Sequence, residues 1–411
     1  MSAQIAISRA EQGEAVDGLA FRAETLRILS WWASHAVDEQ MGGFWGEVDC
    51  EGHPVAGADK GGVLNARLLW FFSAVAHRCH RVDAAILARR AFDYFRSHFV
   101  DRAHGGVYWS VDASGRVKNA RKQAYGQAFA IYGLTEFHVA TGDMEALGLA
   151  RELLSQIETR FWDPDGGGYI EALSEDWGGL SDQRLSERDL DCPKTMNTHL
   201  HILEAYSRLY QAAPDSACEK ALRRTTQVLL TRFIEGDGRQ LRLFFDMDWT
   251  DRTHSVSFGH DIEASWLIWE AVQALDDATL QARARPVVLG LAAATLSKGV
   301  LPSGGLAYEQ ELVGARDEDG EWWGQAEGLI GFVNAWEISG DEAYLSAAGR
   351  LWAHIARKHA GDPDGEWTWY AADSPRPRQA LAGPWKCPYH NGRAMLELDR
   401  RLGSRGQPWQ I

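Results

Sequence analysis

Three histidines stand near the starts of separate apolar segments, where they could exchange protons with a bound molecule. His201, His260 and His390 each have amides, carboxylates or tryptophans close by in the chain. A histidine in a buried helix is usually a core residue with a hydrogen-bond partner, and 14 histidines must include several of that kind. Because these three recur at equivalent places, we interpret them as functional. Histidine titrates near neutrality, so the chemistry that they suit is general acid and base catalysis.

The helical phase of the segment NTHLH argues against a two-histidine metal clamp. At about 100° per residue, Asn197 and His201 lie within about 40° of each other and share a face. His199 lies about 200° from His201 and points elsewhere. We therefore expect His201 to act beside Asn197 and His199 to be separate from both.

Two further pairs share a helical face. His260 and Glu263 are three residues apart, which predicts that the carboxylate fixes the tautomer of His260 or raises its basicity. Trp323 and Glu327, four apart, are predicted to pair in the same way.

Arg67 interrupts an apolar stretch, and a buried guanidinium needs a partner or a ligand.

Sequence motifs for metals and nucleotides are missing. The chain has no HExxH, no facial triad with its carboxylate and no acidic calcium loop, so we expect no metal. It has no GxGxxG after a strand and no GxxxxGK[ST], which excludes nucleotide cofactors. We predict an enzyme without a cofactor.

A glycine-led, aromatic-rich segment recurs along the chain and predicts the architecture. Plain copies are GGFWGEVD, GGVYWSVD, GGGYIEAL and GGLAYEQE, and weaker ones are GRQLRLFFDMD and GEWTWYAAD, with starts at 42, 105, 166, 304, 238 and 365, respectively. Such a period is typical of repeats that bury their apolar faces against one another. A unit of about 65 residues has room for two helices and a hairpin.

The segments between these hairpins alternate in character. Residues 62–76 and 124–137 are apolar on nearly every side, which is typical of buried helices, whereas residues 83–99 are amphipathic. Six inner and six outer helices predict an all-α fold, the (α/α)6 barrel, with an open solenoid as the alternative. We expect one catalytic domain over residues 1–411, with loose tails at about 1–17 and 404–411. The polar residues at the inner helix starts should face a central cavity, where a buried polar group needs a partner or a task.

Composition narrows the class of partner and the compartment. With 42 basic and 57 acidic residues, the formal charge of -15 argues against a nucleic-acid surface and fits a neutral ligand. The 18 tryptophans offer flat faces that suit sugar rings as well as cores. Five cysteines without a CxxC pair indicate a reducing compartment, and neither a signal peptide nor a membrane span is visible. We expect a cytoplasmic protein without a membrane partner, a monomer or weak homodimer.

The same residues carry a resemblance to a known family. The segments KQAYGQAFAIYG (122–133), CPKTMNTHLHILEAY (192–206), SFGHDIEASWL (257–267), WWGQAEGLIGF (322–332) and WKCPYHNGRAM (385–395) resemble the cellobiose 2-epimerase family, within the N-acylglucosamine 2-epimerase superfamily. The resemblance covers most of the chain and implies an (α/α)6 barrel that interconverts glucose and mannose at the reducing end of β-1,4 disaccharides without a cofactor. Gly324 departs from the proline expected there, which bears on the shape of the cavity.

The resemblance also implies roles for individual residues. The acid/base pair falls on His260 and His390, with His201 assisting. Substrate contacts fall on a larger set: Arg67, Tyr125, Asp189, Asn197, Glu263, Trp322, Trp323, Glu327 and Trp385. Sequence alone places Asp189 in a solvated loop, so its role rests on the resemblance.

Inversion at C2 suits two histidines. It requires an open-chain aldehyde, removal of the C2 proton on one face and return of a proton on the other. We expect His390 and His260 to exchange these roles with direction, and Arg67, Tyr125 and Asn197 to stabilise the charge on O1.

Three alternatives remain at this stage. Family members that act on free mannose or glucose share much of the constellation, and protonation at C1 would give a ketose. A glycoside hydrolase would need two carboxylates across the cleft, with Asp189 and either Glu263 or Glu327 as the pair. A non-catalytic carbohydrate-binding ring would explain the tryptophans but not three facing histidines.

Overall fold

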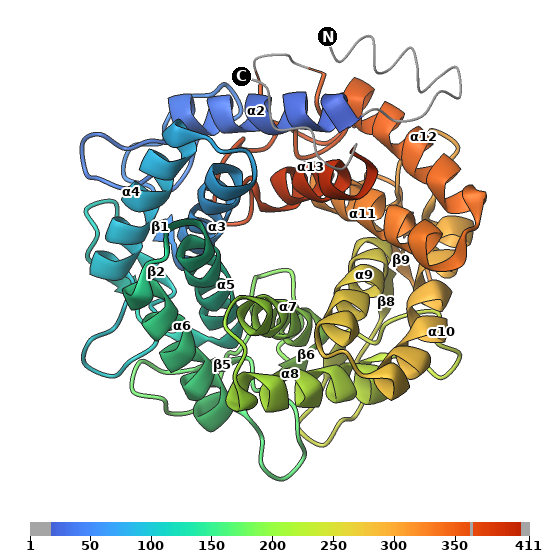
Figure 1. Ribbon diagram of the computed structural model, residues 1–411, viewed down its shortest axis with the longest axis horizontal. Helices are drawn as coiled ribbons and strands as arrows, with labels where there is room; N and C mark the ends of the chain where they lie inside the picture. The colour runs from blue at the N-terminus through green and yellow to red at the C-terminus, as the bar shows by residue number, and fades with distance from the viewer. Residues whose placement is uncertain (1–17, 362–364, 404–411) are drawn as a thin grey trace.

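The computed structural model describes residues 18–361 and 365–403 and confirms the (α/α)6 barrel (Figure 1). Within these residues twelve α-helices form two concentric rings. The inner ring comprises α3 (Gly62–Arg78), α5 (Ala124–Thr141), α7 (Met196–Ala212), α9 (Phe258–Ala274), α11 (Trp322–Ser339) and α13 (Tyr389–Leu402). The outer ring comprises α2 (Gly18–His35), α4 (Val82–His98), α6 (Met144–Gln156), α8 (Ser216–Val228), α10 (Ala278–Ala294) and α12 (Glu342–Lys358). The expected tails at 1–17 and 404–411 lie outside the described residues.

Burial follows the patterns that separate the two rings. Every residue of α5 from Ala124 to Phe137 is buried, as an all-apolar inner helix requires. In α4, Ala88, Phe92 and Phe95 are buried, whereas Arg89 and Asp93 are exposed. Four outer helices begin at an aspartate whose carboxylate accepts a backbone N–H of the first turn; these are Asp143, Asp215, Asp277 and Asp341. The regular spacing of these caps is a second mark of the repeat.

All six repeats share one backbone contact, which confirms the predicted period. In each, an N–H of the glycine-led segment donates to a carbonyl at the end of the preceding outer helix. The pairs are Trp45 to Ala36, Tyr108 to Phe99, Ile170 to Phe161, Arg242 to Phe233, Ala307 to Gly299 and Thr368 to His359. Glycine is required at Gly43, where φ is +64° and a Cβ would lie 2.6 Å from the ring of Tyr94.

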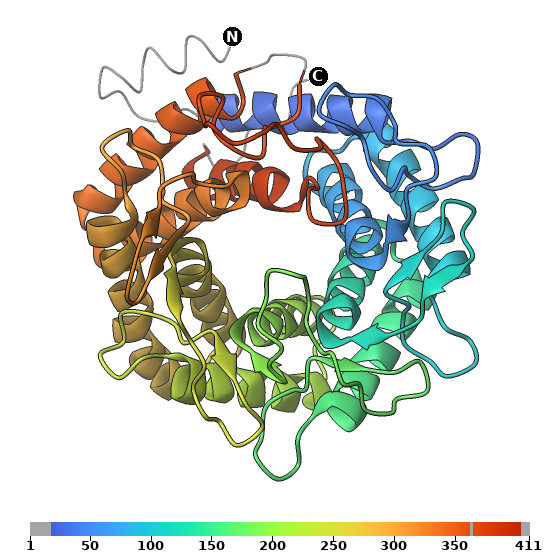
Figure 2. The same ribbon diagram turned by 180° about the vertical axis from the view of Figure 1, so that it is seen from behind.

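Short antiparallel strands tie consecutive repeats together over one end of the ring (Figure 2). They are β1 (Lys60–Gly61), β2 (Ser110–Val111), β3 (Val117–Asn119), β4 (Lys122–Gln123), β5 (Ala172–Leu173), β6 (Lys194–Thr195), β7 (Phe244–Phe245), β8 (Ser255–Ser257), β9 (Glu309–Glu311) and β10 (Arg316–Asp317). Four of them, β1, β4, β6 and β8, end directly before an inner helix and pair with a strand of the next repeat. This pairing fixes the N-terminal ends of those inner helices at the same end of the barrel.

Buried ion pairs repeat the same tie. Lys60 Nζ lies 2.8 Å from Asp38 Oδ2, and Lys122 Nζ lies 2.6 Å from Asp101 Oδ2, with both partners of each pair buried. Lys194 and Asp163 form a third such pair at 2.6 Å. Each lysine stands two residues before the first residue of an inner helix. An aspartate shortly before a glycine-led segment therefore anchors the chain just before that helix begins.

The ring is closed, which excludes the open solenoid. The last inner helix, α13, lies beside the first, α3, and is covered by the outer helix α2 (Figure 1). Arg22 of α2 donates to Asp399 of α13 over 2.6 Å.

All five cysteines are free thiols, as their sequence spacing predicted. Among the described helices, none combines the length and apolarity needed to cross a membrane.

Candidate active site

A cavity of about 630 Å³ opens at the N-terminal ends of the inner helices. Eleven of the twelve predicted site residues line it: His201, His260, His390, Arg67, Tyr125, Asp189, Asn197, Glu263, Trp322, Trp323 and Trp385. The twelfth, Glu327, is fully buried and contacts the cavity residue His390. The structure therefore brings together side chains that are spread over 324 residues of sequence, between 67 and 390.

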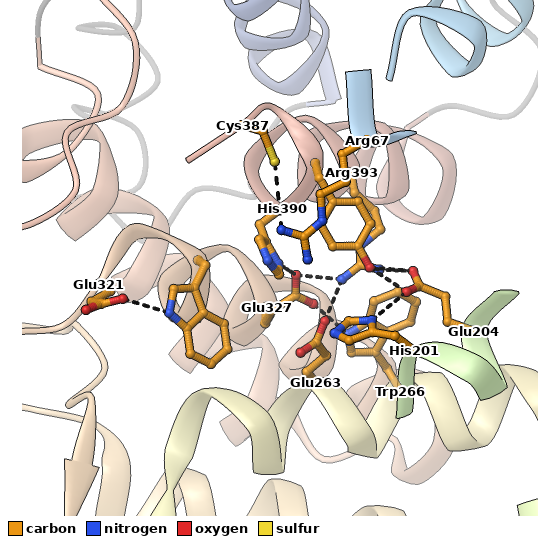
Figure 3. Close-up of polar contacts among 12 residues, drawn as sticks. Arg67, His201, Glu204, Glu263, Trp266, Glu321, Glu327, Cys387, His390 and Arg393 are labelled. Carbon is orange, nitrogen blue, oxygen red and sulfur yellow. Dashed lines mark hydrogen bonds and ion pairs between the residues drawn. The ribbon is translucent and has the colours of Figure 1, made fainter. Parts of the chain in front are cut away.

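The register of the inner helices explains this convergence. The sixth residue of α3, α7, α9 and α11 is Arg67, His201, Glu263 and Glu327, respectively, and that of α5 is Phe129. In α13, which begins one residue later in the repeat, the corresponding residue is Arg393. Figure 3 shows these polar side chains pointing toward one another in the centre of the ring. Repetition of one helical position thus places five polar groups around one axis.

His390 is oriented by a buried carboxylate. Its Nδ1 lies 2.6 Å from Glu327 Oε1, and Glu327 Oε2 accepts a hydrogen bond from Trp266 Nε1 at 3.0 Å. Burial lowers the pKa of His390 well below its usual value, and the guanidinium groups of Arg67 and Arg393 add to this. The imidazole is thus predominantly neutral, with a carboxylate in place to stabilise the protonated form.

His260 is oriented differently from the prediction. Its Nδ1 lies 2.8 Å from the hydroxyl of Ser257, not against Glu263. Glu263 Oε1 instead accepts from Arg393 Nη2 at 2.8 Å, because a buried carboxylate is stabilised more by a guanidinium than by a neutral imidazole. The predicted orientation of His260 by Glu263 is therefore wrong. Burial lowers the pKa of His260 to about 3.

The indole of Trp323 contacts both imidazoles. Its ring centroid lies 4.7 Å from that of His260 and 5.7 Å from that of His390. Its Nε1 donates to Glu321 Oε2 at 3.0 Å, so the predicted pairing with Glu327 is wrong. Glu327 is held one turn deeper by Trp266 and His390.

His201 has a carboxylate partner on its own helix. Its Nδ1 lies 2.9 Å from Glu204 Oε2, and its ring meets Tyr125 edge-on at 5.0 Å. Burial alone would raise the pKa of Glu204, but Arg393 and His201 more than offset this and lower it to about 2. Burial lowers the pKa of His201 in spite of that carboxylate.

His199 lies apart from this group, as its helical phase predicted. Its Nδ1 bonds the carbonyl of Thr195 at 2.7 Å, and its Nε2 accepts the N–H of Tyr169 at 2.8 Å. Gln127 and Gln325 occupy the same helical position in α5 and α11 and also bind hairpin backbone. His199 therefore has a structural role.

Arg67 is the cationic wall of the cavity. It is buried between the rings of Phe129 and Tyr389, with its guanidinium carbon 4.1 and 4.5 Å from their centroids. Its Nη2 donates to the hydroxyl of Tyr125 at 2.8 Å. Its Nε has no hydrogen-bond partner among the described residues. Arg67 and Tyr125 can together stabilise negative charge on a substrate oxygen.

The loop before β6 covers part of the cavity. Leu185, Ser186, Arg188 and Asp189 line it from this loop. Ser186 Oγ donates to Asp189 Oδ2 at 2.6 Å, and burial raises the pKa of Asp189. Arg188 Nη1 reaches across to Glu321 Oε1 at 3.0 Å. Asp189 therefore lies in the cavity wall, where the family resemblance placed it.

Tryptophans form an aromatic wall at the opening. The ring of Trp385 lies 6.0 Å from Tyr125 and 6.1 Å from Trp109, and Trp322 lies 4.4 Å from Trp369. Sequence reasoning did not select Trp109 and Trp369, because they lie outside the inner helices. Such faces suit the apolar sides of sugar rings.

Sequence reasoning also missed the supports of the histidines. Arg393, Glu204 and Ser257 bind predicted site residues, and Tyr389 donates to Glu204, yet none of the four was selected. Two signals in the sequence could have found three of them. Arg393 occupies the repeat position of Arg67 and His201, while Glu204 and Ser257 stand three residues from a selected histidine.

Glu263, Glu327 and His390 bring one donor atom each within 4.8 Å of one another, which is the spacing of a metal site. Arg393 Nη2 lies 2.8 Å from Glu263 Oε1 and 2.7 Å from Glu327 Oε1. A guanidinium thus occupies the position between the two carboxylates. The residues present fit this cation rather than a metal ion.

Comparison with known proteins gives the site its context. The model of a family described as N-acylglucosamine 2-epimerase (GlcNAc 2-epimerase) matches residues 43–394. The chain is 44% identical to the cellobiose 2-epimerase of Bacteroides fragilis, over 91% of this chain and 96% of that protein. It is 35% identical to the cellobiose 2-epimerase of Dictyoglomus turgidum, over 92% and 96%. The structure of cellobiose 2-epimerase from Bacillus thermoamylovorans B4167 matches with a TM-score of 0.88 at 36% identity, over 93% of this chain and 99% of that one.

Proposed function

Because the chain belongs to the N-acylglucosamine 2-epimerase family, whose members identify it as an isomerase that acts on carbohydrates, we propose that it inverts C2 of the reducing-end glucose of cellobiose and related β-1,4 disaccharides. The observation that carries this proposal is the pair His260 and His390. Both line one cavity and both contact the indole of Trp323. A base on each face of a carbon is what inversion by proton transfer requires.

The reaction begins from the open-chain aldehyde. One neutral imidazole takes the C2 hydrogen as a proton, and the electron pair of the C–H bond moves toward C1, which leaves negative charge on O1. The other imidazole, in its protonated form, returns a proton to C2 on the opposite face. The two histidines thereby exchange protonation states, and proton exchange with solvent, or the reverse reaction, restores them before the next turnover in the same direction. Each general acid or base step contributes about 10²–10⁴-fold.

Charge on O1 needs donors that are already in place. Arg67 and Tyr125 are linked by a 2.8 Å hydrogen bond and both face the cavity, and Asn197 joins them from α7. Donors that are fixed before the reaction pay no reorganisation cost when the charge develops. His201, beside Tyr125, is placed to move a proton during ring opening.

The remainder of the cavity supports a disaccharide. Its volume of about 630 Å³ lies within the range of small-molecule sites, and it extends from the histidines to Trp109, Trp369 and Trp385. We assign the second sugar to this aromatic end, with Trp385 stacking on it. Asp189 and Arg188 would close over it from their loop.

A single experiment in D2O tests the proposal. The purified protein is incubated with cellobiose and, separately, with mannose, and the C2 proton of the reducing end is followed by NMR. We expect the mannose-ended disaccharide with deuterium at C2. Conversion of mannose alone would move the assignment to free monosaccharides, and deuterium at C1 of a ketose would indicate isomerisation. Free glucose from cellobiose would indicate a hydrolase, and no change with either sugar would overturn the proposal.

A further inference from the structure

Arg393 lies at the centre of the inner ring and contacts three carboxylates from three other helices. Its Nη2 lies 2.8 Å from Glu263 Oε1 of α9 and 2.7 Å from Glu327 Oε1 of α11, and its Nη1 donates to Glu204 of α7. The guanidinium also packs over the ring of Tyr389, at 4.1 Å from its centroid. Its side chain is 2% exposed, so these contacts are shielded from water.

Two of these carboxylates in turn hold histidines of the proposed mechanism. Glu327 Oε1, which binds Arg393, lies 2.6 Å from His390 Nδ1. Glu204 lies 2.9 Å from His201 Nδ1 and accepts a hydrogen bond from the hydroxyl of Tyr389 at 2.6 Å. One arginine therefore connects the supports of two imidazoles that belong to different helices.

Arg393 itself is outside the catalytic cavity. It lines a second cavity, of about 580 Å³, which contains Glu204 and Trp266 and extends along the C-terminal halves of the inner helices. Of its three carboxylate partners, Glu263 lines the proposed substrate site, and Glu204 and Glu327 bind histidines that line it. Arg393 therefore reaches the histidines by contact only through these carboxylates, in addition to the direct electrostatic effect of its charge on the pKa of His201 and His390.

The charges of this group make the arginine necessary. Three buried carboxylates face two buried guanidinium groups, Arg67 and Arg393. Burial and mutual repulsion already raise the pKa of Glu263 and Glu327. Without Arg393, the three carboxyl groups would face one guanidinium in a low dielectric, and that cost is relieved only by taking up protons or by moving the side chains. Either change would release the Nδ1 partners of His201 and His390.

We propose that Arg393 is a positioning residue for the epimerisation: it holds Glu204 and Glu327 in place, so that they fix the orientation and the Nδ1 protons of His201 and His390. This inference rests on the proposed two-histidine function. It assigns to one buried side chain the alignment of two histidines, while His260, bound to Ser257, is outside its control.

The pH dependence of the site gives this role a signature. Several titratable or charged groups face Arg393 and the imidazoles: Arg67 of α3, Tyr125 and Tyr132 of α5, His201 and Glu204 of α7, His260 and Glu263 of α9, Glu327 of α11, and Cys387 and Tyr389 at the start of α13. The second cavity, which Arg393 lines, adds charged groups from five helices: Arg78, Arg208, Glu270, Glu337, Glu397, Arg400 and Arg401. On the other side of α13, Lys386 pairs with Glu366 and Asp399 with Arg22. Loss of one positive charge from this group favours proton binding at every remaining member. The pH profile of kcat/KM should therefore move to higher pH.

The test compares Arg393→Met, Arg393→Lys and the control Arg401→Met. Arg401 is another arginine of α13, with a side chain that is 6% exposed, and it pairs with Glu270, Glu337 and Glu397. Within the described residues, none of these carboxylates pairs with a histidine of the site. For Arg393→Met we expect kcat to fall about 10²-fold or more, with KM changed by less than about threefold and the pH profile displaced upward. Arg393→Lys should keep the wild-type pH profile and recover part of kcat. Arg401→Met should keep both kcat and the pH profile.

Two results would overturn this role. One is a folded Arg393→Met protein, by circular dichroism, with the wild-type kcat and pH profile. The other is an equal loss of activity in Arg401→Met, which would indicate a general effect of buried charge. Failure of the proposed function is recognised separately, because the wild-type protein would then leave the C2 proton of cellobiose unexchanged.

An NMR measurement that needs no catalytic turnover tests the positioning role even if the proposed function fails. In protein labelled with ¹⁵N-histidine, Nδ1–H protons that are bound to carboxylates resonate far downfield. We expect two such signals to be lost in Arg393→Met, one each in Glu204→Gln and Glu327→Gln, and none in Arg401→Met. Persistence of both signals in Arg393→Met would refute the positioning role whatever the substrate proves to be.

Discussion

The two imidazoles that face the proposed reaction centre occupy corresponding places in their repeats but have different partners. His390 Nδ1 meets Glu327, a fully buried carboxylate that is bound in turn to Arg393 and Trp266. Among the described residues, the hydrogen-bond partner of His260 Nδ1 is the hydroxyl of Ser257. A carboxylate stabilises the imidazolium and fixes one tautomer, whereas a hydroxyl can donate or accept and accommodates either form. Two similar bases can therefore serve one reaction from two different environments.

The largest effects should come from removing either base, which tests whether both are needed. His260→Phe and His390→Phe keep an aromatic ring beside Trp323 but cannot carry a proton. We expect epimerisation to fall about 10⁴-fold in each. In D2O each variant should still exchange the C2 hydrogen of one sugar, because the remaining histidine serves one face. The two variants should prefer opposite sugars, glucose-ended or mannose-ended.

The matched control is His53→Phe, since the side chain of His53 is 73% exposed and lies outside the cavity. It should epimerise at the wild-type rate. Exchange of both sugars by both single variants would contradict the assignment of one histidine to each face.

An intermediate effect should follow from making the partner of His390 neutral. Glu327→Gln keeps a side chain of the same shape but removes a negative charge next to the imidazole. The pKa of His390, which burial already lowers, should fall further. The profile of kcat/KM should then move to lower pH, opposite to the shift expected for Arg393→Met, with kcat reduced about 10²-fold.

Glu136→Gln is the control for this variant. Glu136 is fully buried and bound to Arg208 at 2.6 Å, but it lies in the last turns of α5, away from the histidines. It should change stability without moving the pH profile. A shift of the Glu327→Gln profile to higher pH would show that this carboxylate does not govern His390.

How much of this arrangement the sequence predicts depends on whether the signal is local. The glycine-led segments and the alternation of apolar and amphipathic stretches are local, and they were enough for the closed barrel. The starts of the inner helices were equally readable, because polar residues such as Arg67 and Asn197 stand out in apolar segments. Eleven of the twelve selected residues consequently reached the same cavity.

The hydrogen-bond partners that residues find on other inner helices could not be predicted from the sequence, for a physical reason. Helical phase shows that His260 and Glu263 share a face, but it does not show which groups on other helices compete for Glu263. The group that binds Glu263 is Arg393, which is 130 residues away in sequence. A single buried guanidinium thereby overrode a favourable local spacing, and only the closed ring reveals that it is near.

The smallest effect should come from Ser257, and it offers the sharpest test of the difference between the two bases. Ser257→Ala removes one neutral hydrogen bond from His260, worth about 1 kcal/mol, so kcat should fall about fivefold while Ser257→Thr, which keeps the hydroxyl, stays near wild type. Ser257→Asp would instead give His260 a carboxylate like that of His390. Because a negative charge raises the pKa of a neighbouring imidazole, and burial has lowered that of His260 to about 3, the kcat/KM profile should move to higher pH. A loss in Ser257→Ala as large as that in Glu327→Gln would mean that the two bases depend on their partners equally, and that the hydroxyl does for His260 what the carboxylate does for His390.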